Sequence, residues 1–167
     1  MDISANSLSG FQLALAVRIG GILHAIPIQS VEEVLPALPI EIVPQCPSYL
    51  RGVVFVRGQL IPVLDAAERL GIRNHVRVSE PPIVCLRVET HLVGLEVDEA
   101  VDLIDVPRTL LAIEDVNIHG GFLSGFVEQE GQLIRILNVE RMIAQQEADE
   151  LKSLAGMVAA DVDSRLK

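Results

Sequence analysis

Aromatic and basic residues are scarce in this chain of 167 residues. It contains four Phe, one Tyr and no Trp, and its 13 Lys and Arg stand against 23 Asp and Glu, which gives a formal net charge of −10. Proteins that bind nucleic acid need a basic stripe to neutralise phosphates, and those that bind single strands add aromatic side chains on which bases stack. The composition therefore argues against nucleic acid as a partner.

Long apolar runs are also missing, although 50% of the residues are hydrophobic. No run approaches the roughly 18 apolar residues that a membrane-spanning helix requires. The N-terminal stretch has neither the basic nor the apolar region of a secretory signal. Cys46 and Cys85 stand alone, without metal-ligand spacing, and we expect buried free thiols. These features indicate a reduced, cytoplasmic, acidic globular protein with no direct membrane insertion.

The residue combinations that carry catalysis are missing as well. The four histidines have no ligand-like spacing, and the chain has no His-Glu-x-x-His, Cys-x-x-Cys or Gly-x-Ser-x-Gly pattern. His119–Gly121 is interpreted as a flexible turn rather than an oxyanion loop. The acidic residues Asp98, Glu99, Asp102 and Asp105 lack the glycine and terminal Glu of a calcium loop, which favours a solvated face. We therefore predict no catalytic residue, no cofactor, no metal site and no enzymatic activity.

An internal repeat organises the residues that are present. Gly58–Asp65 (GQLIPVLD) returns 73 residues further on as Gly131–Asn138 (GQLIRILN), and Tyr49–Gly52 returns at the same offset as Phe122–Gly125. A weaker similarity lies before these copies, where residues 25–28 resemble residues 94–97 at an offset of 69. We therefore expect one domain over residues 10–145, made of two similar barrel-forming halves, about 10–80 and 81–145.

Each half begins with two apolar strands joined by a turn, and a hairpin follows later in the half. The strands are expected over residues 11–19, 22–28, 83–88 and 92–97. The hairpins turn near Arg57–Gly58 and near residues 128–131. Short, numerous strands rich in Val, Ile and Leu and separated by Gly and Pro are typical of small closed barrels. The pattern predicts a mainly β fold of two pseudo-repeated small β-barrels packed together.

Helical patterns occur at three places along the chain. Val31–Leu35 has apolar residues at helical spacing and ends at a proline. Asp65 and Gly71 are suited to begin and end a short helix after the first hairpin. Asn138 is suited to cap a helix that continues into the C-terminal helix and tail, residues 146–167.

The segment Tyr49–Asp65 (YLRGVVFVRGQLIPVLD) resembles the signature of the CheW-like family of chemotaxis adaptors. That signature runs through an aromatic or apolar pair, a basic residue, Gly-Val, an Asn-Leu-Arg-Gly turn and an apolar strand with Pro and Asp. Residues 92–98 resemble the family's second-half strand, and residues 122–125 and 133–138 resemble its closing hairpin. The resemblance covers about 10–145 and implies two intertwined five-stranded β-barrels around a hydrophobic core.

The resemblance implies a non-catalytic adaptor that acts by binding alone. One surface would bind the CheW-like regulatory domain of a CheA-type histidine kinase, and another would bind the cytoplasmic tip of methyl-accepting chemoreceptors, which places the protein near the membrane. Arg57 falls on the family's receptor-side arginine, and Val31 and Glu33 fall on the same receptor-facing surface. Gly52 and Gly58 are interpreted as structural residues that let the hairpin turn and pack.

The residues alone leave alternatives for these roles. Arg57 and Glu33 could be solvated, and Val31 could belong to the core of a short helix. Apolar residues at 38, 40 and 42 are candidates either for kinase contact or for barrel lining. Phe55 stands where the family usually has Asn, a change that removes a hydrogen-bonding side chain and adds apolar area.

Other functions are compatible with the same pattern. The chain could be the CheW-like adaptor of a type IV pilus or another non-flagellar chemosensory pathway, with the same fold and different receptors. It could also be a fragment of a CheV-type protein or of the kinase. An unrelated two-barrel protein would instead hold a small ligand between its halves, and that ligand would raise the melting temperature with its concentration.

Overall fold

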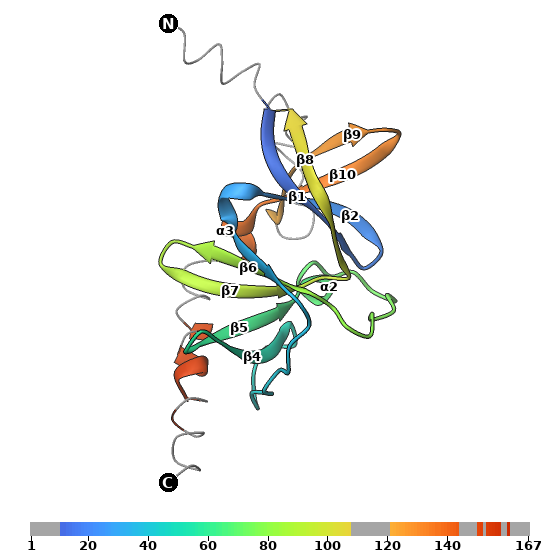
Figure 1. Ribbon diagram of the computed structural model, residues 1–167. Helices are drawn as coiled ribbons and strands as arrows, with labels where there is room; N and C mark the ends of the chain where they lie inside the picture. Colours follow the sequence, from blue (N-terminus) through green and yellow to red (C-terminus); the bar gives the residue numbers. More distant parts are fainter. Residues whose placement is uncertain (1–10, 108–120, 144–149, 152, 158–159, 161–167) are drawn as a thin grey trace, which may run out of the picture.

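A computed structural model of the chain describes residues 11–107, 121–143, 150–151, 153–157 and 160. In this part of the chain, ten strands form two five-stranded sheets, the first in the upper and the second in the lower part of Figure 1. The first sheet contains β1 (Phe11–Ile19), β2 (Ile22–Pro27), β8 (Glu99–Pro107), β9 (Leu123–Gln129) and β10 (Gln132–Leu137). The second contains β3 (Val31–Leu35), β4 (Leu50–Val56), β5 (Gln59–Asp65), β6 (Ile83–Val88) and β7 (His91–Glu96). The prediction of a mainly β fold with two five-stranded units is confirmed.

Each sheet takes strands from both halves of the repeat. The strand orders are β8-β1-β2-β10-β9 and β3-β6-β7-β5-β4, and each order becomes the other when every strand is replaced by its repeat equivalent. The parallel pairs β2–β10 and β5–β7 join the halves at the centre of each sheet. The boundary near residue 80 therefore divides the sequence but not the sheets, because each half gives three strands to one sheet and two to the other.

The hairpin turns follow from local backbone preferences. Arg57 and Gly58 have φ values of 49° and 80°, and Glu130 and Gly131 have 51° and 77°. Two consecutive residues with positive φ suit the right-handed twist of a two-residue hairpin, and glycine adopts the second position without steric conflict. Both hairpins therefore turn where the sequence predicts.

Two one-turn helices follow the hairpins at equivalent positions of the repeat. They are α2 (Ala66–Arg69) and α3 (Val139–Met142). The Asp65 side chain accepts a hydrogen bond from the Glu68 amide at 3.2 Å, and the Asn138 side chain accepts one from the Arg141 amide at 3.1 Å. Both predicted N-caps are thus confirmed. The expectation that the helix capped by Asn138 continues into the tail is wrong at Ile143, because α3 ends at Met142 and Ile143 has a non-helical backbone. Residues 150–151 and 153–157 of the expected tail helix are helical, whereas residues 144–149 lie outside the described part of the chain.

The helix expected over Val31–Leu35 is wrong, since these residues form β3. A short 3₁₀ turn, η1 (Ile28–Ser30), precedes it, and the strand pairs antiparallel with β6. Exposed and half-buried residues alternate along β3, and Val34 is the exposed apolar member. Pairing with β6 overrides the helical spacing, because it satisfies the backbone of a β-branched segment that is too short for a stable helix.

The equivalent strand of the second half, β8, contains most of the acidic cluster. Glu99, Asp102 and Asp105 are exposed on this edge strand, which pairs with β1. Asp98 lies just before it and accepts a hydrogen bond from the Gly21 amide at 2.7 Å. Acidic residues at an exposed edge discourage pairing with further strands.

The core has one shared part and two local parts. The largest cluster includes Val17 of β1, Leu64 of β5, Leu95 of β7 and Leu137 of β10, so it lies between the two sheets. A smaller cluster lines the first sheet and another lines the second. Because both sheets bury side chains against the shared cluster, the two units pack as one body.

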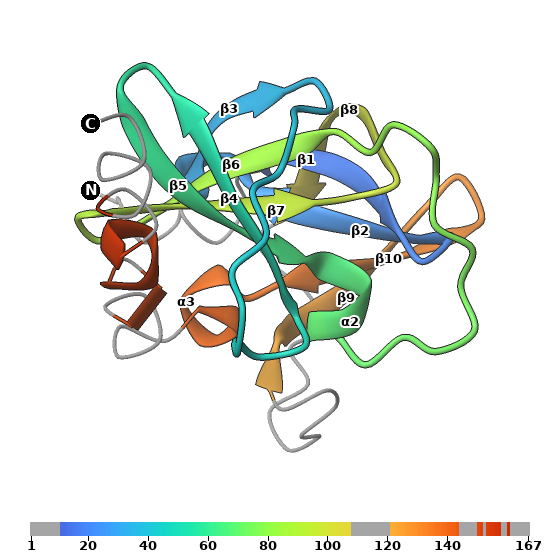
Figure 2. The same cartoon turned by 90° about the horizontal axis from the view of Figure 1, so that it is seen from below.

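Arg69 joins the two halves next to this shared core. Its guanidinium lies 4.3 Å from the ring centroid of Tyr49 and 4.8 Å from that of Phe122, and its Nε donates to the Met142 carbonyl at 2.8 Å. Tyr49 and Phe122 are equivalent in the repeat, as are Arg69 and Met142. Figure 2 shows α2 and α3 on the same lower side of the molecule, and the Arg69 side chain of α2 reaches the end of α3.

Candidate protein-binding surface

Arg57 and Glu33 form a two-pronged ion pair at the surface of the second sheet. Arg57 Nη1 lies 2.5 Å from Glu33 Oε1, and Nη2 lies 2.7 Å from Oε2. The turn between β4 and β5 supplies Arg57 and β3 supplies Glu33, although β3 and β4 are opposite edges of the sheet order. The pair therefore bridges two edges that the curvature of the sheet brings together. The hydrogen bond to Glu33, followed by the carboxylate charge, raises the pKa of Arg57.

The two partners differ in exposure, which decides what each can do. The Arg57 side chain is 74% exposed, whereas that of Glu33 is 25% exposed. Val31 lies on the same strand as Glu33, half-buried and packed against the shared core. Arg57 therefore faces solvent while Glu33 and Val31 anchor the sheet beneath it.

A second ion pair lies beside the first on β3. Arg87 of β6 donates from its Nε to Glu32 Oε2 at 3.0 Å. This hydrogen bond, followed by the charge of Arg87, lowers the pKa of Glu32. Both arginines thus hold carboxylates of β3, and they differ in that Arg57 is the more exposed.

Gly52 and Gly58 occupy different kinds of position. Gly52 has φ 146°, and a Cβ there would lie 2.2 Å from the Glu41 carbonyl oxygen. The missing side chain lets Glu41 and Val53 exchange two backbone hydrogen bonds of 2.9 Å. Gly58 has open space around it, so only its positive φ favours glycine.

Phe55 lies on the surface rather than in the core. Phe55 is 71% exposed. It lies on β4 opposite Leu60 of β5 and two residues before Arg57. The family's usual Asn is therefore replaced by an exposed ring beside the arginine turn, which adds apolar contact area to that surface.

The three apolar candidates before β4 have different surroundings. Leu38 and Ile40 are partly buried against the cluster that lines the second sheet, whereas Ile42 is 79% exposed. Leu38 and Ile40 are thus part of the lining of the sheet. Ile42 alone among the three is available to a partner over most of its surface.

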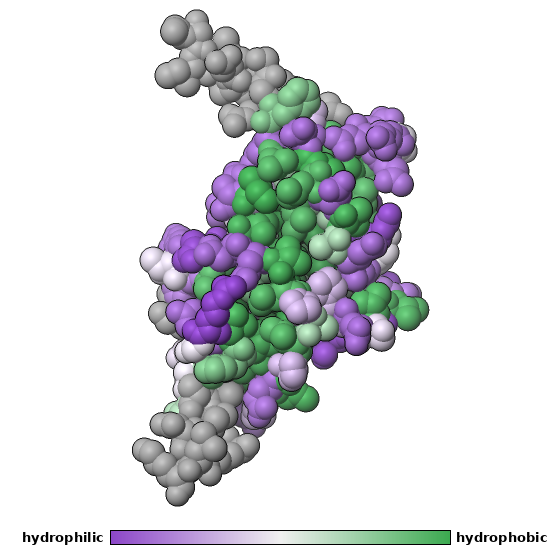
Figure 3. Space-filling model, in the orientation of Figure 1, coloured by the Kyte–Doolittle hydropathy of each residue, from purple (hydrophilic) through white to green (hydrophobic). Residues whose placement is uncertain are grey.

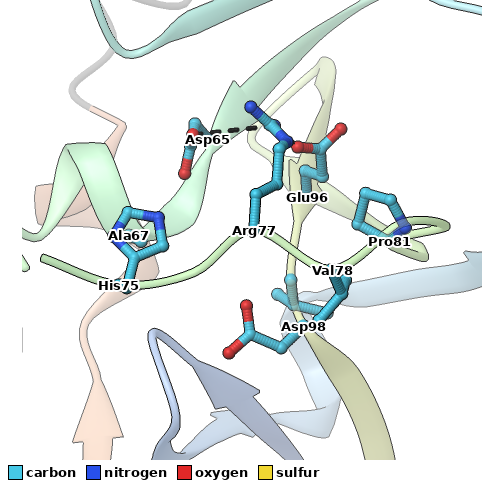
Figure 4. Close-up of a pocket in the computed structure, with 9 residues that line it drawn as sticks. Asp65, Ala67, His75, Arg77, Val78, Pro81, Glu96 and Asp98 are labelled. Atoms are coloured by element: carbon cyan, nitrogen blue, oxygen red, sulfur yellow. Dashed lines mark ion pairs between the residues drawn. The ribbon is translucent and has the colours of Figure 1, made fainter.

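A charge cluster around the buried Glu96 was not predicted from the sequence. Arg77 makes ion pairs with Glu96 and, at 3.6 Å, with Asp65, and Arg51 Nε lies 3.3 Å from Glu96 Oε1. Figure 4 shows Arg77 reaching from its loop toward Asp65 and Glu96, which come from separate strands. Burial, and then the charge of Arg51, lowers the pKa of Arg77, while Asp65 opposes the shift. A glutamate in the apolar stretch LVGLEV was the signal that could have revealed the cluster.

The two thiols behave differently from each other. Cys85 is buried, as expected, and desolvation raises its pKa to about 11. Cys46 is only half-buried, and its Sγ lies 3.0 Å from the Val43 carbonyl oxygen. At neutral pH the Cys85 thiol is therefore protonated and a poor nucleophile.

The described residues contain no group of three His, Cys, Asp or Glu side chains arranged to hold a metal ion. None of the helices in the described ranges has the length and apolar character needed to cross a membrane. What this surface does present is a set of ion pairs, an exposed ring and exposed aliphatic residues on two curved sheets. Aromatic and arginine side chains of this kind are enriched in the interfaces of proteins that bind other proteins.

Comparison with known proteins identifies the family. The CheW-like domain family model matches residues 13–147, so the chain belongs to the CheW-like domain family. The chain is 26% identical over 153 residues to the probable chemotaxis protein CheW of Rhizobium etli, covering 89% of this chain and 99% of that one. It is 28% identical over 146 residues to the chemotaxis protein CheW of Thermotoga maritima, covering 87% and 95%.

A solved structure supports the fold. The crystal structure of the scaffolding protein TtCheW from Thermoanaerobacter tengcongensis superimposes with a TM-score of 0.74 at 22% identity, covering 82% of this chain and 95% of that chain. Members of the family are non-catalytic scaffold or adaptor proteins, so this chain is a chemotaxis adaptor or scaffold and not an enzyme. An unrelated two-barrel ligand-binding protein is thereby set aside.

Proposed function

We propose that this chain couples a CheA-type histidine kinase to methyl-accepting chemoreceptors in the cytoplasm. One surface binds the regulatory domain of the kinase, and the other binds the cytoplasmic tip of the receptor. Membership of the CheW-like family supports the proposal. The observation that carries its receptor half is the exposed Arg57, held in place by Glu33 on a rigid sheet.

Arg57 has the free donors that a receptor contact needs. A guanidinium has five N–H groups, and Glu33 takes one from each of its two terminal nitrogens, which leaves three for another protein. Because the ion pair fixes the turn against β3, these donors point in a defined direction. They suit a carboxylate or carbonyl group on a helical hairpin, and Phe55 adds an apolar contact beside them.

The kinase contact needs a broader apolar face, since it joins one barrel to another. Figure 3 shows apolar side chains gathered over β1 and β8, bordered by hydrophilic ones. The exposed large apolar residues of these two strands are Phe11, Leu13, Val101 and Leu103. We assign the kinase contact to this face, which lies on the other sheet from Arg57.

Binding of the purified partners to Arg57→Glu tests the receptor assignment. We expect the variant to lose receptor-tip binding and to keep kinase binding, both measured by titration calorimetry. Arg87→Glu is the matched control, since it also reverses an arginine that pairs with a carboxylate of β3. Retained receptor binding in Arg57→Glu would overturn the assignment. Failure of the native chain to bind either partner would overturn the adaptor proposal.

A charge exchange separates direct contact from a purely structural role. Arg57→Glu combined with Glu33→Arg restores an ion pair between the turn and β3 but removes the outward guanidinium of the turn. We expect this double variant to recover the melting temperature of the native chain without recovering receptor binding. Recovery of both would show that the pair acts only by holding the turn.

A further inference from the structure

A cleft of about 370 Å³ lies between the segment before β4 and the loop before β6. Leu38, Ile40 and Ile42 form its apolar side, and Arg51, Arg77 and Glu96 contribute its charged groups. Arg51 lies on β4, and Arg57 lies just after its end. This separation of six residues corresponds to about 20 Å along an extended strand. The cleft is therefore separate from the surface around Arg57.

The charged part of the cleft has more donors than acceptors. Arg51 and Arg77 both approach Oε1 of Glu96, which is only 6% exposed. Arg51 Nε is buried and has no hydrogen-bond partner among the described residues, although the Arg51 side chain as a whole is 37% exposed to the cleft. The two guanidiniums also repel each other, and this repulsion adds to burial, the larger cause, in lowering the pKa of Arg77. An additional carboxylate could not reach the buried Nε, but at the exposed part of the Arg51 side chain it would supply acceptors and reduce this repulsion.

The apolar side determines what must accompany that carboxylate. Ile42 is 79% exposed at the cleft, and Ile40 and Leu38 continue the aliphatic surface inward. Aliphatic side chains of a ligand would bury this surface, while a charge alone would leave Ile42 in water. The volume lies at the lower end of ligand-binding pockets, about 300–1,000 Å³.

We infer that this cleft docks an extended segment of a partner protein in which a carboxylate side chain stands beside aliphatic side chains. The carboxylate binds Arg51, and the aliphatic side chains pack on Ile40 and Ile42. The occupant is a protein segment because the chain is a scaffold that acts through protein contacts. This surface is additional to the receptor and kinase surfaces proposed above.

Methyl NMR of the whole chain with short blocked peptides tests the inference. The probe is acetyl-Leu-Glu-Leu-Leu-amide, and its matched control is the same peptide with Gln in place of Glu. We expect saturable shifts of the Ile40 and Ile42 methyl signals with the first peptide and about tenfold weaker binding of the second, because an ionised acceptor strengthens the contact to Arg51. Because isolated peptides are used, the outcome is independent of whether the proposed kinase and receptor bind.

Variants of both parts of the cleft complete the test. Arg51→Gln is expected to remove the preference for the Glu peptide, whereas Arg87→Gln, an arginine on a different strand, keeps it. If Arg51→Gln lowers the melting temperature, Ile42→Ser provides a second variant at an exposed position, and it should weaken both peptides several-fold. Equal binding of the Glu and Gln peptides, or no saturable shift of the Ile42 methyls at low-millimolar peptide, would overturn the inference.

Discussion

Replacement of Arg69 by methionine is expected to weaken the contact between the two halves and to lower the free energy of unfolding. Methionine keeps the length and part of the apolar contact but removes the charge and the Nε donor. In the native chain the guanidinium stacks against Tyr49 and Phe122 and donates to the Met142 carbonyl. The variant therefore leaves the two rings without a cation and the carbonyl at the end of α3 without this donor.

The size of the effect follows from these contacts. Each cation–π contact of a half-buried arginine contributes about 1 kcal/mol. A hydrogen bond from a charged donor contributes about 1.5–3 kcal/mol. Because methionine retains some packing and the contributions are not additive, we expect the free energy of unfolding to fall by about 3 kcal/mol. For a chain of this size that corresponds to a decrease of about 6–12 °C in the melting temperature.

Urea unfolding and differential scanning calorimetry measure this change. Arg141→Met is the matched control, since Arg141 is an exposed arginine of the equivalent helix, and its replacement should change the free energy by less than about 0.5 kcal/mol. In a double-mutant cycle, Arg69→Met and Phe122→Leu should show a coupling of about 1 kcal/mol. A loss below about 1 kcal/mol for Arg69→Met, or no coupling to Phe122, would refute the reasoning.

Three further predictions concern backbone strain, thiol reactivity and pH. Gly52→Ala places a Cβ against a backbone carbonyl at 2.2 Å and should lower the free energy of unfolding in urea by more than about 3 kcal/mol, whereas Gly58→Ala, with open space, should cost only about 1 kcal/mol. With a disulfide reagent at pH 7.5, Cys46 should react faster than Cys85, whose burial raises its pKa to about 11, and both should react at similar rates in urea; faster reaction of Cys85 in the folded chain would contradict this. The neighbouring guanidinium lowers the pKa of Glu32 in the folded chain, so its contribution to stability is present above the ordinary value of 4.5 and is lost as the pH falls through the folded-state pKa. The stability difference between the native chain and Glu32→Gln, measured by urea unfolding, should therefore disappear in acid.

Local signals predicted much of the fold. The strands over residues 11–19 and 83–88 have the predicted bounds, because each is a mostly apolar segment that ends at a turn. The two hairpin turns and the N-caps Asp65 and Asn138 also agree with the structure. These features depend on contacts within a few residues, so the order of residue types is sufficient to reveal them.

Two of the four edge strands, β3 and β8, were the least predictable elements. The apolar residues of β3 happen to have helical spacing, and acidic residues at three of the nine positions of β8 interrupt its apolar pattern. A strand with one neighbour in the sheet needs no continuous apolar pattern, because only part of it is buried. Pairing with β6 and with β1, which lie far away in the sequence, decides the conformation of these segments.

The sequence indicated the residues of the candidate site but not how their side chains contact one another. Resemblance to the family indicated Arg57, Glu33 and Val31, but not that the arginine and the glutamate form a two-pronged ion pair. The positions of Arg51, Arg77 and Glu96 carry no common motif, since they are spread over 45 residues. Their proximity is known only from the fold.

The sequence by itself determined the repeat, the composition of the strands, the turns, the caps and the family to which the chain belongs. The tertiary structure alone decided that the halves exchange strands, that Arg69 lies between two equivalent rings, and that two arginines share the buried carboxylate of Glu96. The physical reason is that turns and caps depend on side chains a few residues apart, whereas strand pairing uses backbone groups that are alike at every position. Which of these groups pair depends on how the whole chain buries its apolar surface, and that is a property of the complete fold.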